Sequence, residues 1–101
     1  MISNEKTLVW GNISSSGELN SGQGVKAVVK NSEGSYTVVF AENFSSLPAV
    51  NATVVRNRES GFDTRDNAMV NTISVSQFTV ITGDHSGDPN DRDFTFVAVG
   101  A

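Results

Sequence analysis

The stretch GSYTVVFAENFSSLPAV, residues 34–50, decides the fold because it places two β-strand patterns around a short interruption. Tyr36, Val38 and Phe40 alternate with smaller residues, and this period of two is typical of a strand with one buried face. Residues 41–47 break the alternation. Pro48 then opens a second strand pattern, at the position where its missing N–H costs least.

The same alternation continues along the chain and predicts a single all-β domain over residues 1–101. Strand patterns cover residues 8–13, 25–30, 36–40, 49–55, 69–75, 77–82 and 93–99. Residues 14–24 read as a turn-rich segment, residues 31–34 as a tight hairpin turn, and residues 56–68 and 83–92 as polar loops. About seven or eight short strands at ~8–14-residue spacing predict an antiparallel, jelly-roll-like β-sandwich.

Composition excludes several classes of function. The net charge is -4 and the sequence pI is about 4.7. This argues against a nucleic-acid partner or an anionic membrane, because binding phosphates requires a basic patch. No cysteine is present, so disulfides, thiolate catalysis and cysteine-based zinc sites are excluded. No apolar run approaches the ~20 residues of a membrane helix. Residues 1–6 lack the apolar core of a signal peptide. We also expect no cofactor.

The last strand pattern is apolar on both faces. Phe94, Phe96 and Ala98 point to one face, whereas Val97 and Val99 follow Thr95 on the other. One face must fill the core, so the second needs another partner. The second face is either covered by a loop of the same chain or forms a subunit interface. We predict an interface through Val97, Val99 and Val39, the last of which lies opposite the aromatic face of its own strand.

The polar loop after residue 55 is the candidate ligand-binding site. Guanidinium and carboxylate groups suit hydroxyl-rich sugars, and an aromatic ring can stack on a sugar face. The predicted contact residues are Arg56, Arg58, Phe62, Asp63 and Arg65. The alternative is a self-neutralising surface loop with Phe62 folded back on the core.

The polar loop at residues 83–92 favours a structural interpretation. Asp84, His85 and Ser86 are consecutive, whereas a catalytic triad needs groups that converge from different elements, so no catalytic residue is predicted. The aspartates of the same loop lack the spacing of a calcium loop, and we expect an acidic turn in which Asp side chains bond to backbone N–H groups. Asp91 or Asp93 is expected to pair with Arg92 or with a neighbouring subunit's arginine.

Trp10 is expected to be a core or interface anchor.

Three segments together resemble the C-terminal head domains of phage tail fibres and of collagen-like bacterial surface proteins. The segments are Gly11-x-Ile13 with Gly17 and Gly22-x-Gly24; Gly34-x-Tyr36-x-Val38-x-Phe40 with Phe44, Pro48 and Val50; and Phe78-Thr79-Val80 with Gly87, Asp91 and Phe94-x-Phe96-Val97-Ala98-Val99-Gly100. Each motif is weak alone, and their order and spacing are more specific. The loop at residues 56–67 is more charged than the family pattern, and residues 1–101 contain no Gly-x-y repeat.

The resemblance implies a jelly-roll sandwich similar to tumour-necrosis-factor-like heads, which trimerises and binds cell-surface glycans without being an enzyme. It also implies a place on a virion or extracellular surface. The alternative is a structural trimerisation or capping domain with no ligand of its own. The resemblance further implies that Phe44 enters the core as the chain leaves the first sheet, and that Pro48 starts a strand elsewhere in the sandwich.

Overall fold

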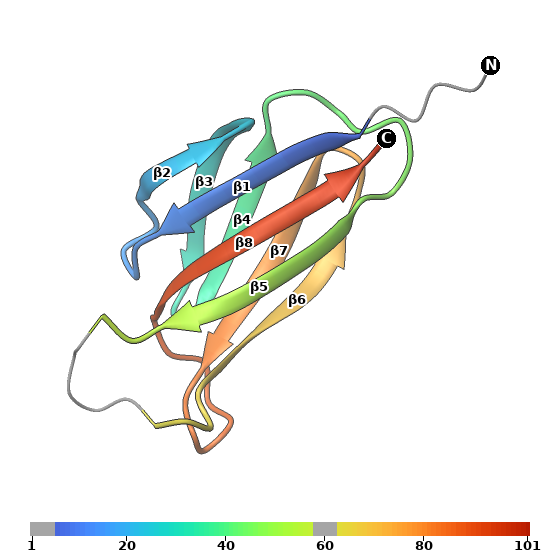
Figure 1. Cartoon of the computed structure of the whole chain (residues 1–101). Helices are drawn as coiled ribbons and strands as arrows, with labels where there is room; N and C mark the ends of the chain where they lie inside the picture. The colour runs from blue at the N-terminus through green and yellow to red at the C-terminus, as the bar shows by residue number, and fades with distance from the viewer. Residues whose placement is uncertain (1–5, 58–62) are drawn as a thin grey trace.

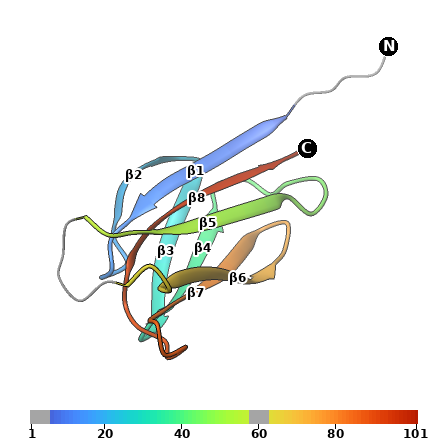
Figure 2. The same ribbon diagram turned by 60° about the horizontal axis from the view of Figure 1, so that its bottom comes forward.

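The chain forms two antiparallel sheets packed face to face, as the alternating sequence predicts (Figures 1 and 2). The computed structural model describes residues 6–57 and 63–101. Within these residues there are eight strands and no helix. They are β1 (Thr7–Ile13), β2 (Leu19–Gln23), β3 (Val25–Ser32), β4 (Ser35–Phe40), β5 (Ala49–Val55), β6 (Asn67–Ile73), β7 (Gln77–Gly83) and β8 (Asp93–Gly100). The predicted all-β sandwich is confirmed.

Each sheet contains four strands from distant parts of the sequence. Sheet A has the order β2-β1-β8-β5, and sheet B has the order β3-β4-β7-β6. The first and last strands are neighbours in sheet A, where Thr7 lies opposite Gly100 and Ile13 lies opposite Phe94. The start of β1 and the end of β8 therefore lie at the same end of the sandwich (Figure 1).

One aromatic core fills the space between the sheets. Tyr36, Val38 and Phe40 face inward from β4 in sheet B, and Phe94, Phe96 and Ala98 face inward from β8 in sheet A, all of them buried. Phe78 bridges the two sets, since its ring centroid lies 4.8 Å from that of Phe96 and 5.8 Å from that of Phe40. Such tilted aromatic pairs add packing energy to the area that they bury.

The crossing inferred for residues 34–50 is present. The chain leaves sheet B after Phe40 and enters sheet A at Ala49. On the way Phe44 is buried, with its ring 5.0 Å from the ring of Phe40 in an edge-to-face arrangement. The aromatic pair anchors the crossing segment to the core.

The strand β2 lies inside the segment 14–24, which the sequence predicted as turns, and this part of the prediction is wrong. Residues 19–23 pair with β1 through the backbone, while every one of them is exposed. An edge strand without a buried side chain has no alternating pattern, and only its backbone hydrogen bonds place it.

The hairpin predicted at residues 31–34 joins β3 to β4. Its Gly34 has a φ of +69°, which a side chain would strain. A Cβ there would lie 2.6 Å from the Thr82 carbonyl oxygen and 2.7 Å from the Asn90 nitrogen. The turn therefore packs directly against the end of β7 and the chain that follows it, and only glycine fits. Among the described residues, no helix has the length and apolarity needed to span a bilayer.

Candidate functional site

A cavity lies where β5 ends and the chain approaches β6. Val54, Arg56, Asp63, Thr64 and Asp66 line it, and its volume is about 270 Å³. We call it the Arg56 cavity. Of the five predicted contact residues, it contains Arg56 and Asp63, whereas Arg65 does not line it. The other two, Arg58 and Phe62, lie outside the described residues.

A buried ion pair holds Asp66, one of the residues that line the Arg56 cavity. The Arg92 Nε donates to Asp66 Oδ2 at 3.2 Å, and the backbone N–H of Asp63 donates to the same oxygen at 3.2 Å. The side chain of Asp66 is 1% exposed and that of Arg92 is 12% exposed. Arg92 therefore pairs with the carboxylate of Asp66 rather than with that of Asp91 or Asp93, so the first of the two expected pairings is wrong. The alternative, a neighbouring subunit's arginine, stays a prediction.

The second carboxylate oxygen of Asp66 lacks a donor. Within the part of the chain that the structure describes, Oδ1 is buried and has no hydrogen-bond partner. A buried acceptor of this kind costs free energy comparable to a lost hydrogen bond, and more when it carries charge. Asp66 also lines the Arg56 cavity, so a ligand that donates a hydrogen bond would relieve this cost once the side chain turns Oδ1 toward the cavity.

Arg65 and Asp63 form an exposed pair beside the cavity. The Arg65 Nε and one Nη donate to the two carboxylate oxygens of Asp63 at 3.0 and 2.9 Å. This hydrogen-bonded guanidinium lowers the pKa of Asp63 far below its ordinary range. The pair is self-neutralising, which agrees in part with the alternative of a self-neutralising surface loop. Asp63 also lines the cavity together with Arg56.

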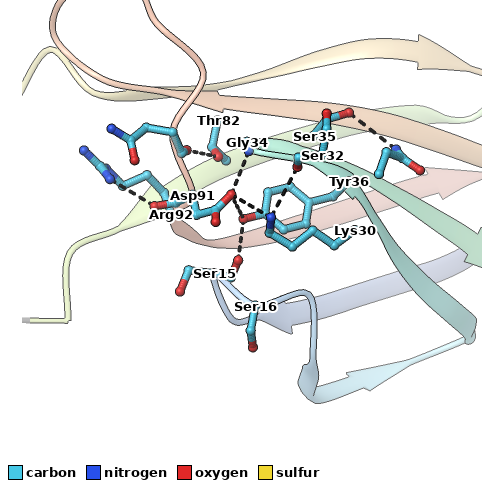
Figure 3. Close-up of polar contacts among 12 residues, drawn as sticks. Ser15, Ser16, Lys30, Ser32, Gly34, Ser35, Tyr36, Thr82, Asp91 and Arg92 are labelled. Atoms are coloured by element: carbon cyan, nitrogen blue, oxygen red, sulfur yellow. Dashed lines mark hydrogen bonds and ion pairs between the residues drawn. The ribbon is translucent and has the colours of Figure 1, made fainter.

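A second polar cluster surrounds Asp91 at the same end of the sandwich (Figure 3). One Asp91 carboxylate oxygen accepts a hydrogen bond from the Gly34 N–H at 2.7 Å and forms an ion pair with Lys30 at 3.2 Å. The Tyr36 hydroxyl donates to the Ser15 carbonyl at 2.7 Å. Burial and the nearby Asp91 charge raise the pKa of Tyr36 to about 12. The cluster joins the 14–18 turn, the 32–35 turn and the chain before β8, and we assign it to stability.

The loop around His85 is a self-contained acidic turn. One Asp84 carboxylate oxygen accepts the backbone N–H groups of Ser86 and Asp88 at 2.9 and 3.1 Å. These bonds lower the pKa of Asp84. This is the arrangement expected of an acidic turn. Among the described residues, no group of three or more His, Cys, Asp or Glu side chains could hold a metal ion.

The outer face of sheet A carries a continuous apolar surface. Four residues form it, and we call them the apolar ladder: Leu8, Trp10, Val97 and Val99. Leu8 lies opposite Val99 and Trp10 lies opposite Val97 in the register of β1 and β8. They are between 37% and 48% exposed, whereas Phe94, Phe96 and Ala98 on the inner face are buried. The last strand is apolar on both faces as predicted, and within residues 6–57 and 63–101 no loop covers the outer one.

Val39 lies on the opposite side of the molecule from Val97 and Val99. It belongs to β4 in sheet B, where Tyr36, Val38 and Phe40 face the core and Val39 faces outward. The three residues predicted for the interface therefore do not form one surface. The outer face of sheet B also differs in character, since Thr37, Thr79 and Thr72 follow one another across its strands.

Comparisons of the chain with protein-family models, with curated proteins and with solved structures find no match. The resemblance to tail-fibre heads gains no support from them and stays a prediction.

Proposed function

We propose that the protein is a non-enzymatic recognition module that binds a hydroxyl-rich ligand, a carbohydrate, in the Arg56 cavity. The observation that carries this proposal is the buried Oδ1 of Asp66, which lacks a hydrogen-bond partner among the described residues and belongs to a side chain that lines the cavity together with Arg56. Asp66 needs a donor, and the guanidinium of Arg56 supplies donors of its own. A hydroxyl group both donates and accepts, so a neutral sugar can satisfy the two side chains with neighbouring hydroxyls.

Size and position agree with this ligand class. A cavity of about 270 Å³ lies near the lower end of small-molecule sites, which span roughly 300–1,000 Å³. It holds one small ligand or the end of a chain. The cavity also lies beside turns that a rigid sandwich supports, which is where binding residues are common.

The resemblance to fibre heads adds three elements to the proposal: a jelly-roll-like winding, a homotrimer, and a receptor-binding role on a virion or extracellular surface. No catalytic residue is part of it. The Asp84 carboxylate is occupied by backbone N–H groups of its own turn, which supports a structural role for that loop.

A glycan array probed with the purified chain tests the proposal. We expect a hit whose affinity falls at least about tenfold in Arg56→Ala, the effect of losing one charge-assisted hydrogen bond. Lys26→Ala is the matched control, because it removes an exposed cation from β3 in the other sheet. Circular dichroism establishes that both variants are folded.

Two results would overturn carbohydrate binding in this cavity. One is an array without any hit for the folded wild-type chain. The other is a hit that Arg56→Ala leaves unchanged, or that Lys26→Ala weakens equally.

The second candidate is a structural assembly domain without a ligand, which the exposed apolar ladder favours. A folded chain that associates and binds no glycan would support it.

A further inference from the structure

We propose that the apolar ladder on the outer face of sheet A is the surface through which copies of this chain associate. The inference deepens the multi-copy part of the proposed function and does not depend on a sugar in the Arg56 cavity. The first observation that supports this inference is that the apolar ladder is continuous across two strands. Leu8 with Val99, and Trp10 with Val97, are directly opposed pairs on adjacent strands. Exposed contiguous apolar surface on a small soluble domain marks an interaction site.

The neighbouring rows favour a copy of the same chain as the partner. Beside the ladder the outward side chains are Ala49, Asn51 and Thr53 on β5, Asn12 and Thr95 on β1 and β8, and Gln23 and Ser21 on β2. None of these residues is charged, although the chain carries a net charge of -4. The first charged side chain along β8 on this face is Asp93, opposite Val55, and its carboxylate accepts hydrogen bonds from Ser15 and Asn57. The uncharged rows beside the ladder can therefore meet another copy without the repulsion that two acidic surfaces would impose.

The side chains around the ladder favour a protein partner over a sugar. Its members are one tryptophan and three aliphatic residues, and aliphatic side chains offer no ring on which a sugar can stack. The ladder's row nearest the end of β8 is wholly aliphatic, with Leu8, Val99 and Ala49 in register. Such a row gains free energy mainly by being removed from water against another apolar surface.

The area of the outer face of sheet A sets the expected strength of association between copies. Four strands of about seven residues, at ~3.4 Å per residue and ~4.8 Å between strands, give a projected face of about 450 Å² in each copy. Two such faces total about 900 Å², close to the ~1,000 Å² of the smaller specific interfaces. Association should therefore depend on concentration in the micromolar range rather than being permanent.

Light scattering over a micromolar concentration series tests the proposal, together with the fluorescence of Trp10, the only tryptophan of the chain. We expect the mass to rise from 10.7 kDa toward a multiple of it. Because Trp10 lies in the ladder, its emission should shift to shorter wavelength in step with the mass. Both measurements use the wild-type chain and need no variant. A mass of 10.7 kDa at every concentration, or association without a change in Trp10 emission, would overturn the proposal.

A matched pair of substitutions locates the surface. Val97→Lys places a charge in the ladder, and Val29→Lys places one on the outer side of sheet B; the two valines are 47% and 48% exposed. We expect Val97→Lys to weaken association at least about tenfold, because an unpaired ammonium would be buried, and Val29→Lys to leave it unchanged. The reverse pattern would contradict the assignment. A monomeric wild type whose Trp10 emission responds to a soluble glycan would also overturn it, and would identify the ladder as a sugar platform.

Discussion

At the scale of single residues, burial controls the ionisation of Tyr36. Its side chain is fully buried and its hydroxyl donates to the Ser15 carbonyl. The pKa rises from 10.0 to about 12, mainly because the phenolate would be desolvated. Between these values the unfolded chain loses the phenolic proton and the folded chain keeps it. This contribution to stability is therefore complete below pH 10 and is lost as the pH rises toward 12.

The prediction can be measured cleanly because Tyr36 is the only tyrosine. Difference absorbance of tyrosinate should show ionisation near pH 12 in the folded protein and near pH 10 in urea. Tyr36→Phe should cost about 1 kcal/mol at neutral pH, the net value of a typical hydrogen bond. It should also lack the Tyr36 part of the alkaline loss. Ionisation of the native protein near pH 10 would show that the ring is not buried in this way.

Asp66 and Asp63 lie three positions apart in one turn and should respond very differently to loss of charge. Asp66→Asn should cost about 3 kcal/mol, because it leaves the Arg92 guanidinium without a buried carboxylate. Asp63→Asn should hardly move the urea midpoint, because its bonds to Arg65 are exposed and screened by solvent. Equal midpoint shifts in urea unfolding would contradict the assignment of Asp66 as the structural member of the turn.

The Asp66–Arg92 pair shows what the sequence did not reveal at this scale. The polar loop after residue 55 was recognised, and two of its predicted residues, Arg56 and Asp63, line the cavity. The partner of Asp66 is 26 positions away on the chain before β8. A pair set by the packing of two irregular segments has no periodic signal, so sequence spacing cannot predict it.

At the scale of secondary-structure elements, the 32–35 turn depends on the glycine at position 34. Gly34→Ala should destabilise the fold by roughly 3 kcal/mol or more, because positive-φ strain adds to the clash with the Thr82 and Asn90 backbone. Gly87→Ala is the matched control. Its φ is +82° and no atom lies within 4 Å of the added Cβ, so it should cost only the strain of roughly 1–2 kcal/mol. Thermal unfolding of the two variants decides, and similar losses would refute the close packing at Gly34.

Strands with a buried face were predictable, and strands without one were not. β5 was predicted with its observed bounds, 49–55, and β4 within one residue, because alternating apolar residues of each contact the core. β2 was missed because its five residues are all exposed and only backbone pairing with β1 defines it. The order of strands within each sheet also lies beyond local pattern, since β1 and β8 meet from opposite ends of the sequence.

At the scale of the whole molecule, the two sheets should unfold together. Their inner faces share one set of buried aromatic residues, so neither sheet has a core of its own. In dilute solution, Trp10 fluorescence reports on sheet A and the near-ultraviolet signal of Tyr36 on sheet B. We expect a single denaturation midpoint from both probes, as two-state unfolding requires. Two separated midpoints would show that the sheets are independent units.

The adjacency of β1 and β8 has a mechanical consequence. Thr7 and Gly100 face each other at one end of the β1–β8 pair, the central pair of sheet A. A force applied at these two positions would therefore separate β1 from β8 one hydrogen-bonded pair after another. Bonds loaded in sequence yield at lower tension than bonds sheared together. Handles attached there should release the sandwich at low force in an optical trap, and pulling from Ile13 and Gly100, at opposite ends of the same two strands, should require much more.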